Sequence, residues 1–304
     1  MFELRQSFLL FITATIWGSG FIGQSIGMDH VAPFTFTFFR TLIGALVLLP
    51  VIFWLKKRAK RHHQVQKAPN RKALIMGSLV CGTCLISAES FQQFGLVYTE
   101  ASKAGFITSM YIIFVPFLSW IFGRRPNLLV LIATLLSAVG LYLLCIEDPS
   151  SLHLQTGDLL ILICALVFAV HILAIAHYVE QVDGVELSCG QFFVASFLGL
   201  ITMLLFDKNL TFDNIMAAAP AMLWCGVMSN GVAYTLQIVG QRGINPTIAT
   251  IILSLESVMA VFFGYLILDE SLNGRQYVGC AIMLAAVIIA QLNPRLILRL
   301  IGRS

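Results

Sequence analysis

The chain has 304 residues, of which 58% are hydrophobic and 11% are charged, and its formal net charge is +4. A water-soluble domain carries about 25% charged residues, so this composition excludes a protein surrounded by water and predicts one surrounded by lipid. The positive residues are spread over several short loops and form no aromatic-interleaved groove, which argues against nucleic acid as a partner. The seven cysteines all fall in apolar runs, where we expect them to pack as small hydrophobic side chains without disulfides.

Ten apolar runs are long enough to cross a bilayer, which takes about 20 residues. The first run begins near Gln6 and is too long for the apolar part of a cleavable signal sequence. The breaks between the runs carry Pro, Gly, Asn and charged residues. We therefore predict an all-α membrane protein with ten transmembrane helices, at 6–25, 33–55, 73–97, 104–122, 128–146, 158–179, 188–206, 216–240, 246–268 and 276–292.

The segment 56–72 fixes the expected orientation, because it holds eight Lys or Arg residues and no acid. Loops rich in Lys and Arg stay on the cytoplasmic side. With both termini in the cytoplasm, the loops on that side hold 15 of the 19 basic residues and the opposite loops hold 3. The remaining one, Arg40, lies inside a predicted helix. The charge distribution therefore predicts that both the N-terminus and the C-terminus face the cytoplasm.

The chain also repeats itself. When residues 92–107 are set over 237–252, Gln92 meets Gln237 and Gly95 meets Gly240, and two further identities follow. Earlier in the chain, ATIWG at 14–18 lies over ALVFA at 165–169. These matches predict two five-helix halves, 1–150 and 151–304, in opposite orientations because each half has an odd number of spans. Inverted repeats of this kind are common in secondary transporters, which bind substrate at the midplane.

The chain resembles the EamA-type transporters of the drug/metabolite transporter superfamily. The segments that carry the resemblance are TIWGSGFIG (15–23), FTFFRTLIGA (36–45), GLVYTEASKAGFITSMYIIFVPFLSW (95–120) and AYTLQIVGQRGINPTIATIILSLESVMAVFFGYLILDESL (233–272). The resemblance implies ten helices in two inverted repeats, alternating access, export of small polar metabolites and a place in the bacterial inner membrane. One departure is that Ser257 follows Glu256, where the family often has proline, which leaves the local helix geometry open.

Charges inside a membrane are costly and usually face the interior of the bundle. Glu256 is about nine residues, or roughly 14 Å, from the inner end of its helix, which is close to the bilayer centre. We expect it to bind a proton or a substrate amine, with a structural hydrogen bond between helices as the alternative. Arg40 and Glu89 lie at similar depths on successive helices, which predicts an ion pair. That pair is either static or a site where Arg40 binds a substrate carboxylate and Glu89 acts as its switch partner.

Uncharged polar residues in the spans form a second group of candidates. Gln92 and Gln237 occupy matching positions of the repeat, so both are expected to reach the central cavity or to bond neighbouring helices. Trp17, beside Gly18, is expected either to line the cavity or to mark a close helix crossing. Further candidates for substrate contact are Gln93, Tyr111, His171, Asn230 and Tyr234.

No enzyme motif is present, and neither a cofactor nor a metal site is expected. The expected partners are a small-molecule substrate, protons as a candidate coupling ion, and membrane lipids, with no protein partner indicated. We predict a secondary transporter of small polar metabolites, amino acids or related compounds among them, that works outward by alternating access. The alternatives are an uncoupled, channel-like facilitator, a nucleotide-sugar-type antiporter and, less favoured, a membrane-embedded lipid enzyme.

Overall fold

The computed structural model describes residues 2–61, 70–98, 101–121, 123, 126–146, 156–207, 211–268 and 273–292. The centre of the basic segment, 62–69, lies outside these residues, as do the bases Arg124 and Arg125. The acidic pair 269–270 and the basic C-terminal segment 293–304 also lie outside them.

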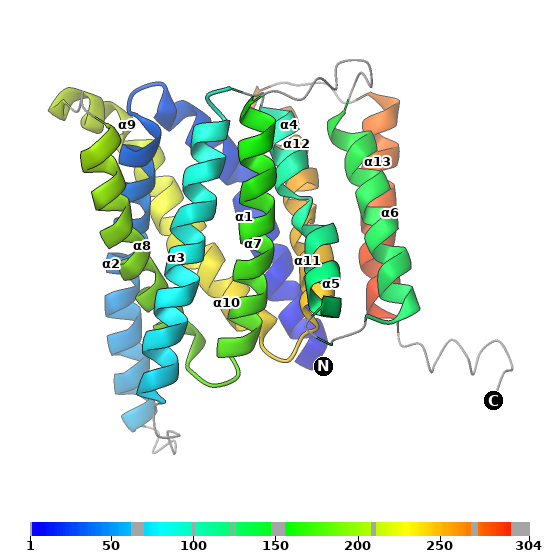
Figure 1. Ribbon diagram of the computed structural model, residues 1–304, viewed down its shortest axis with the longest axis horizontal. Helices are drawn as coiled ribbons and strands as arrows, with labels where there is room; N and C mark the ends of the chain where they lie inside the picture. Colours follow the sequence, from blue (N-terminus) through cyan, green and yellow to red (C-terminus); the bar gives the residue numbers. More distant parts are fainter. Residues whose placement is uncertain are drawn as a thin grey trace, which may run out of the picture.

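The described residues form a bundle of upright helices and no strands, with the N-terminus at the lower end in Figure 1. The part of the chain up to residue 146 contains α1 (Phe2–Met28), α2 (Pro33–Arg61), α3 (Arg71–Gly95), α4 (Ala101–Thr108), α5 (Tyr111–Ile121) and α6 (Leu128–Cys145). The part from residue 156 contains α7 (Thr156–Tyr178), α8 (Gly184–Phe206), α9 (Phe212–Trp224), the π-helix η2 (Cys225–Tyr234), α10 (Thr235–Gln241), α11 (Pro246–Leu253), α12 (Leu255–Leu268) and α13 (Gly274–Gln291).

Within the described residues, nine helical stretches are long and apolar enough to cross a membrane. A tenth apolar helix, Leu128–Leu144, is shorter. Each of the ten predicted runs coincides with one of these stretches, so the all-helical membrane class is confirmed. The number of spans and their orientation stay predictions, because length and composition alone do not place a helix across a bilayer.

Polar side chains start several of these helices. Asn70, Asn127 and Asn245 each accept a hydrogen bond from a backbone N–H in the first turn of α3, α6 and α11. Asp183 does the same for α8, and Asn273 forms a capping box with Gln276 at α13. These caps satisfy N–H groups that have no partner within their own helix, so the capping residues determine where these five helices begin.

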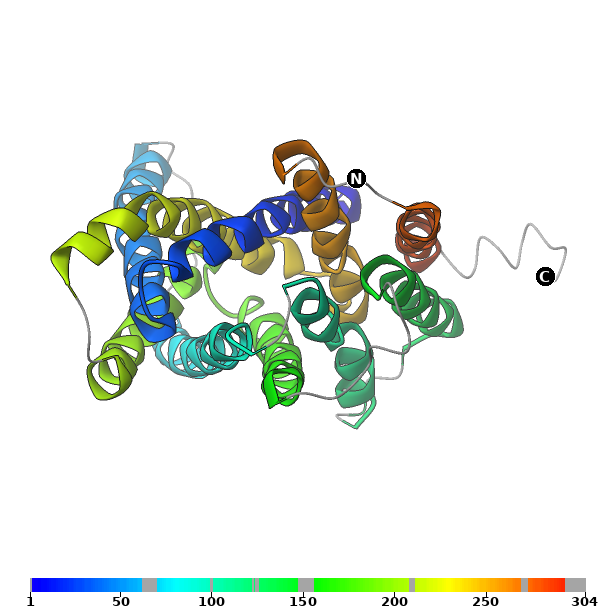
Figure 2. The same ribbon diagram turned by 90° about the horizontal axis from the view of Figure 1, so that it is seen from above.

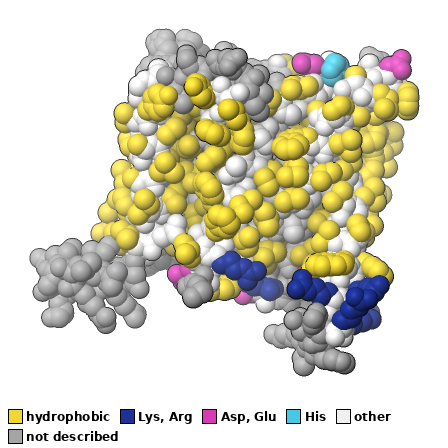
Figure 3. Space-filling view, turned by 180° about the vertical axis from the view of Figure 1, so that it is seen from behind, with side chains coloured by type: hydrophobic (Ala, Val, Ile, Leu, Met, Phe, Trp, Pro, Cys, Tyr) yellow, Lys and Arg dark blue, Asp and Glu magenta, His cyan; other side chains and the backbone are white. Residues whose placement is uncertain are grey.

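The outer surface of the bundle is apolar around its flank. Large hydrophobic side chains stand exposed on many helices, among them Phe53, Leu135, Phe197 and Leu204. Figure 3 shows hydrophobic side chains over most of one flank, with Lys and Arg gathered at one end. A water-soluble monomer rarely exposes an apolar surface of this extent. The flank therefore matches a protein whose surrounding solvent is lipid.

Two predicted helices are broken in the structure. The run predicted at 104–122 consists of α4 and α5 with a turn at Ser109 and Met110 between them. The run predicted at 246–268 consists of α11 and α12, interrupted at Ser254. In the eighth run, ten residues adopt the π-helix η2. A π-helix inside an α-helix is often found at a functional site, and residues in or beside all three irregular stretches line one interior pocket.

Helix packing joins the two parts of the chain throughout the bundle. Helix α2 packs along α8, and α3 packs along both α7 and α8. Helix α1 packs along α12, η2 and α10, while α6 and α13 stand together at one edge in the view from above (Figure 2). The interior between these helices contains the candidate site.

Candidate functional site

A pocket lies between α1, α2, α3, α7, η2 and the broken helices. Its wall draws on both parts of the chain. The lining residues are Trp17, Phe21, Gln24, Arg40, Glu89, Gln92, Thr108, Tyr111, Phe168, Ile172, Ser229, Tyr234, Gln237 and Glu256.

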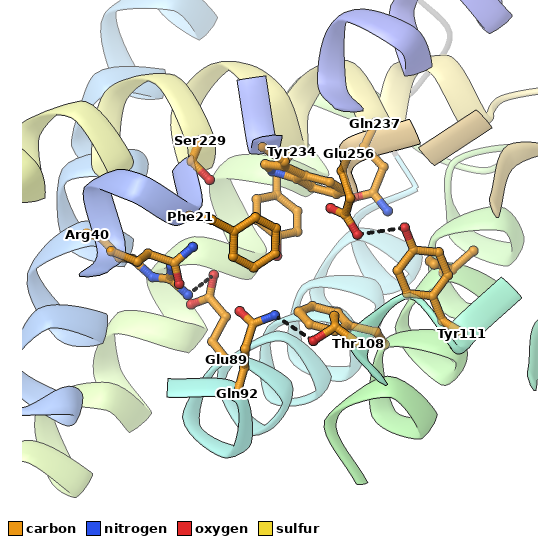
Figure 4. A pocket seen from close by; sticks show the side chains of 14 residues that line it. Phe21, Arg40, Glu89, Gln92, Thr108, Tyr111, Ser229, Tyr234, Gln237 and Glu256 are labelled. Atoms are coloured by element: carbon orange, nitrogen blue, oxygen red, sulfur yellow. Dashed lines mark hydrogen bonds and ion pairs between the residues drawn. The ribbon is translucent and has the colours of Figure 1, made fainter. Parts of the chain in front are cut away.

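Glu256 lies just after the break between α11 and α12 and is buried. The hydroxyl of Tyr111 donates a hydrogen bond of 2.9 Å to Oε1 of Glu256, and Ser109 donates a longer one of 3.4 Å to the same atom. The second oxygen, Oε2, points away from Tyr111 toward the middle of the pocket (Figure 4). Among the described residues no cation pairs with Glu256, so its carboxyl group is available to a proton or to a positively charged ligand.

Arg40 and Glu89 form the predicted ion pair. Nη2 of Arg40 lies 2.9 Å from Oε1 of Glu89, and the two side chains are 3% and 1% exposed. Arg40 belongs to α2 and Glu89 to α3, so the pair joins successive helices at the opposite side of the pocket from Tyr111 (Figure 4). Each charge reduces the cost of burying the other. Whether the pair is static or opens during transport stays a prediction.

The two matched glutamines both reach the pocket. Nε2 of Gln92 donates a hydrogen bond of 3.2 Å to the hydroxyl of Thr108 at the end of α4. Within the described part of the chain, Oε1 of Gln237 has no partner. Four more buried atoms of lining residues lack a hydrogen-bond partner in that part, namely Trp17 Nε1, Gln24 Oε1, Arg40 Nε and Glu89 Oε2. Buried polar groups without partners are costly, so this wall is set up to bind water or a polar ligand.

Aromatic rings close the pocket on one side. The rings of Trp17 and Tyr234 stand 4.7 Å apart, and Tyr234 also packs edge-on against Phe192 behind it. Gly18, next to Trp17, brings α1 against α12, because a Cβ atom at this glycine would lie 2.6 Å from Cβ of Met259. Both interpretations of the Trp17–Gly18 pair therefore apply: the tryptophan lines the pocket and the glycine marks a close crossing.

Eight of the eleven candidate residues predicted from the sequence line this pocket, and their roles in binding or coupling stay predictions. The structure does not place His171, Asn230 or Gln93 on its wall. Nε2 of His171 lies 3.0 Å from Oε1 of Gln191, behind Tyr234, so this histidine joins α7 to α8. Asn230 packs against α2, because a Cβ atom added at Gly44 would lie 2.8 Å from the Cβ atom of Asn230.

Sequence reasoning missed six lining residues: Phe21, Gln24, Thr108, Phe168, Ile172 and Ser229. Most of these are apolar or weakly polar residues within apolar runs and give no signal of their own. The repeat contains a signal for two of them. Setting 14–18 over 165–169 places Trp17 on Phe168, and one further helical turn places Phe21 on Ile172. Both members of each pair line the pocket, as do Gln92 and Gln237.

Comparison with known proteins places the chain among membrane transporters. The model of the EamA-like transporter family matches residues 4–146 and 155–291. An uncharacterized transporter of Archaeoglobus fulgidus is 32% identical over 294 residues, covering 93% of this chain and 85% of the relative. The uncharacterized transporter YoaV of Bacillus subtilis is 20% identical, covering 85% of this chain and 87% of the relative.

A solved crystal structure has the same fold. It aligns with a TM-score of 0.77, covers 96% of this chain and 98% of its own, and is 16% identical in sequence. The family match and the transporter-named relatives point to a transporter rather than an enzyme.

Proposed function

Because the chain belongs to the EamA-like transporter family, we propose that it is a secondary transporter that exports small polar metabolites by alternating access through the central pocket. The observation that carries the proposal is the pocket itself. It is lined from both parts of the chain, it contains a carboxyl group without a paired cation, and its wall holds buried polar atoms without partners.

Matching contacts support an arrangement of two inverted halves, on which many alternating-access transporters are built. A Cβ atom at Gly95 would meet the side chain of Ile161 and the carbonyl oxygen of Gly157. A Cβ atom at Gly240 would meet the side chain of Leu10 and the carbonyl oxygen of Gln6. Under the repeat alignment, Gly95 corresponds to Gly240, Gln6 to Gly157 and Leu10 to Ile161. The contact of α3 with α7 is thus repeated, residue by residue, between α10 and α1.

The distribution of charge supports an orientation with both termini in the cytoplasm, in the inner membrane of a bacterium. Exposed bases at the end of α2 and the start of α3, such as Lys57, Arg58 and Lys72, lie at the same end of the bundle as the N-terminus (Figures 1 and 3). Dense positive charge beside membrane helices stays inside. Export then means movement from this end toward the loops that follow α1 and α3.

The polar groups of the pocket favour a substrate with a positively charged amine, such as an amino acid or a related compound. Among the lining residues, the only Lys or Arg is Arg40, and Glu89 already neutralises it. Glu256 has only neutral hydrogen-bond donors. The unpartnered lining atoms include three acceptors, on Gln24, Glu89 and Gln237, but only two donors. A wall rich in acceptors suits an ammonium group, which has three N–H donors.

The same groups bear on the alternatives. A nucleotide sugar carries negative phosphate groups that require several unpaired bases, and the described lining residues offer none. A proton that competes with the amine for Glu256 would couple the proton gradient to export. An uncoupled facilitator would lack this competition, so the proton dependence of transport separates the two.

A thermal-shift screen tests the proposal and identifies the substrate class. The purified protein in detergent is heated with amino acids, purines, polyamines, sugars and nucleotide sugars, each at several pH values. A ligand that binds only the folded protein raises its melting temperature by mass action. We expect amine-bearing compounds to give the shift in the wild type and to lose it in Glu256→Gln. A shift that only nucleotide sugars give, or one that is the same in Glu256→Gln, contradicts the proposed site.

A further inference from the structure

The bond between Tyr111 and Glu256 joins two positions that correspond to one another in the repeat. Continuing the alignment of 92–107 on 237–252 without a gap places Ser109 on Ser254 and Tyr111 on Glu256. The structure agrees with this register, because the break after α4 includes Ser109 and the break after α11 is Ser254. The hydroxyl of Tyr111 lies 2.9 Å from Oε1 of Glu256. Two corresponding residues that touch must lie on either side of the axis that relates the halves.

The same alignment reveals an exchange of residue types. Glu89 corresponds to Tyr234, so each half supplies one Glu and one Tyr, at exchanged positions. All four line the pocket. Tyr111 and Glu256 form a hydrogen bond across the axis. The corresponding pair, Glu89 and Tyr234, does not, because Glu89 pairs with Arg40 of its own half. Arg40 corresponds to Gln191, which bonds His171 and cannot form the equivalent ion pair.

We propose that Tyr111 is a positioning residue that holds Glu256 on the two-fold axis, so that this one carboxyl group serves the substrate in both access states. The proposal rests on the proposed function, in which the halves exchange conformations. When the halves exchange conformations, each contact between two residues is replaced by the contact between the two corresponding residues of the repeat. Tyr111 and Glu256 correspond to one another, so their contact is replaced by itself. The Tyr111–Glu256 bond therefore persists, whereas contacts away from the axis are made and broken.

A carboxyl group on the axis has a direct functional consequence. Glu256 faces the cytoplasmic side in one state and the outer side in the other without moving away from its partner. Substrate and proton then compete at one position from either side of the membrane. The Arg40–Glu89 pair has no counterpart in the other half, so if it opens when the halves exchange conformations, it stabilises only one of the two access states.

A disulfide beside the axis tests whether this contact persists. Oγ of Ser109 lies 3.1 Å from Oγ of Ser257, immediately next to the Tyr111–Glu256 bond, and neither serine lines the pocket. In Ser109→Cys/Ser257→Cys, a disulfide would join the break after α4 to the first turn of α12, and its formation requires Cβ atoms about 3.5–4.5 Å apart. Mass spectrometry verifies the bond. Counterflow of substrate is then measured in liposomes for the oxidised and the reduced form of this same variant.

We expect oxidation to lower counterflow of the double variant by less than about twofold relative to its reduced form, because the cross-link only fixes what both states share. The single variants Ser109→Cys and Ser257→Cys, treated with the same oxidant, control for effects on native cysteines. Arrest by the disulfide, in protein whose reduced form runs counterflow, overturns the proposal while leaving the proposed function intact. Failure of the disulfide to form contradicts the contact itself. Absence of counterflow in the wild type contradicts the proposed function instead.

Tyr111→Phe tests the positioning role by a second route. Without the hydroxyl, Glu256 loses its shorter hydrogen bond, and we expect the half-saturating substrate concentration to rise about tenfold while the maximal rate changes little. Tyr178→Phe, on α7 outside the pocket, is the matched control and changes neither value. Thermal unfolding of both variants identifies any general loss of stability. An unchanged half-saturating concentration in Tyr111→Phe excludes the role.

Discussion

Glu89→Gln is the sharpest test of what holds α2 and α3 together. The substitution keeps the size of the side chain but leaves the guanidinium of Arg40, a residue that is 2% exposed, without the negative charge that lies 2.9 Å from it. Removing one member of a buried ion pair costs about 3–5 kcal/mol, mostly because the remaining charge stays buried and unpaired. We therefore expect a large loss of thermal stability in Glu89→Gln and a similar loss in Arg40→Met.

The double variant Arg40→Met/Glu89→Leu completes the experiment. Apolar residues of similar volume that replace a buried ion pair often leave stability unchanged or raise it by about 1–4 kcal/mol. We expect the double variant to unfold near the wild-type temperature, so the two single losses do not add. Thermal unfolding in one detergent measures all four proteins. A Glu89→Gln variant as stable as the wild type refutes the argument, because it means that the charge of Arg40 does not depend on Glu89 for its compensation.

Counterflow by the same double variant decides between the two interpretations of the pair. If the pair is only structural, the stable double variant transports at the wild-type rate. If Arg40 binds a substrate carboxylate or the pair biases one access state, transport is lost although the protein is folded. The orphaned Nε of Arg40 and Oε2 of Glu89 on the pocket wall favour the second outcome.

Two further predictions concern packing and orientation. In Gly18→Ala the new Cβ meets Cβ of Met259 at 2.6 Å and the adjacent backbone at 2.7 Å, so we expect thermal unfolding to show a loss of about 1–3 kcal/mol. In the matched Gly20→Ala the nearest atoms are 3.8 Å away, and equal losses in both variants contradict the close crossing. A membrane-impermeant thiol reagent should label Arg58→Cys only from the cytoplasmic side and Asn214→Cys only from the outside, and the reverse pattern rules out the orientation.

Composition and run length were sufficient to predict the fold class and the positions of the helices, because a lipid-facing helix needs a continuous apolar run. The same property hides the breaks. Ser109 and Ser254 lie in runs that stay apolar on both sides, so nothing in the hydropathy pattern marks the ends of α4 and α11. The π-helix η2 is hidden in the same way, since its sequence is compatible with an ordinary helix.

The charged part of the site was more predictable than the rest. A charge in a membrane span requires a partner or a cavity, so the depths of Arg40 and Glu89 were enough to predict their ion pair. His171 is polar and deep in its span, yet its Nε2 bonds Gln191 behind the pocket. Depth alone cannot tell which face of a helix a side chain occupies. The repeat alignment supplies part of this missing information, since it pairs Tyr111 with Glu256 two positions beyond the identity of Ser109 and Ser254.

The most direct test of the central claim is counterflow in liposomes that contain the purified protein, with a substrate identified by thermal shift. Liposomes loaded with unlabelled substrate should accumulate labelled substrate transiently, and an imposed proton gradient should change the rate. Glu256→Gln should remove the dependence on protons or abolish the flux. A flux that does not saturate and shows no exchange contradicts a carrier, and unchanged flux with unchanged proton dependence in Glu256→Gln contradicts the central carboxyl group.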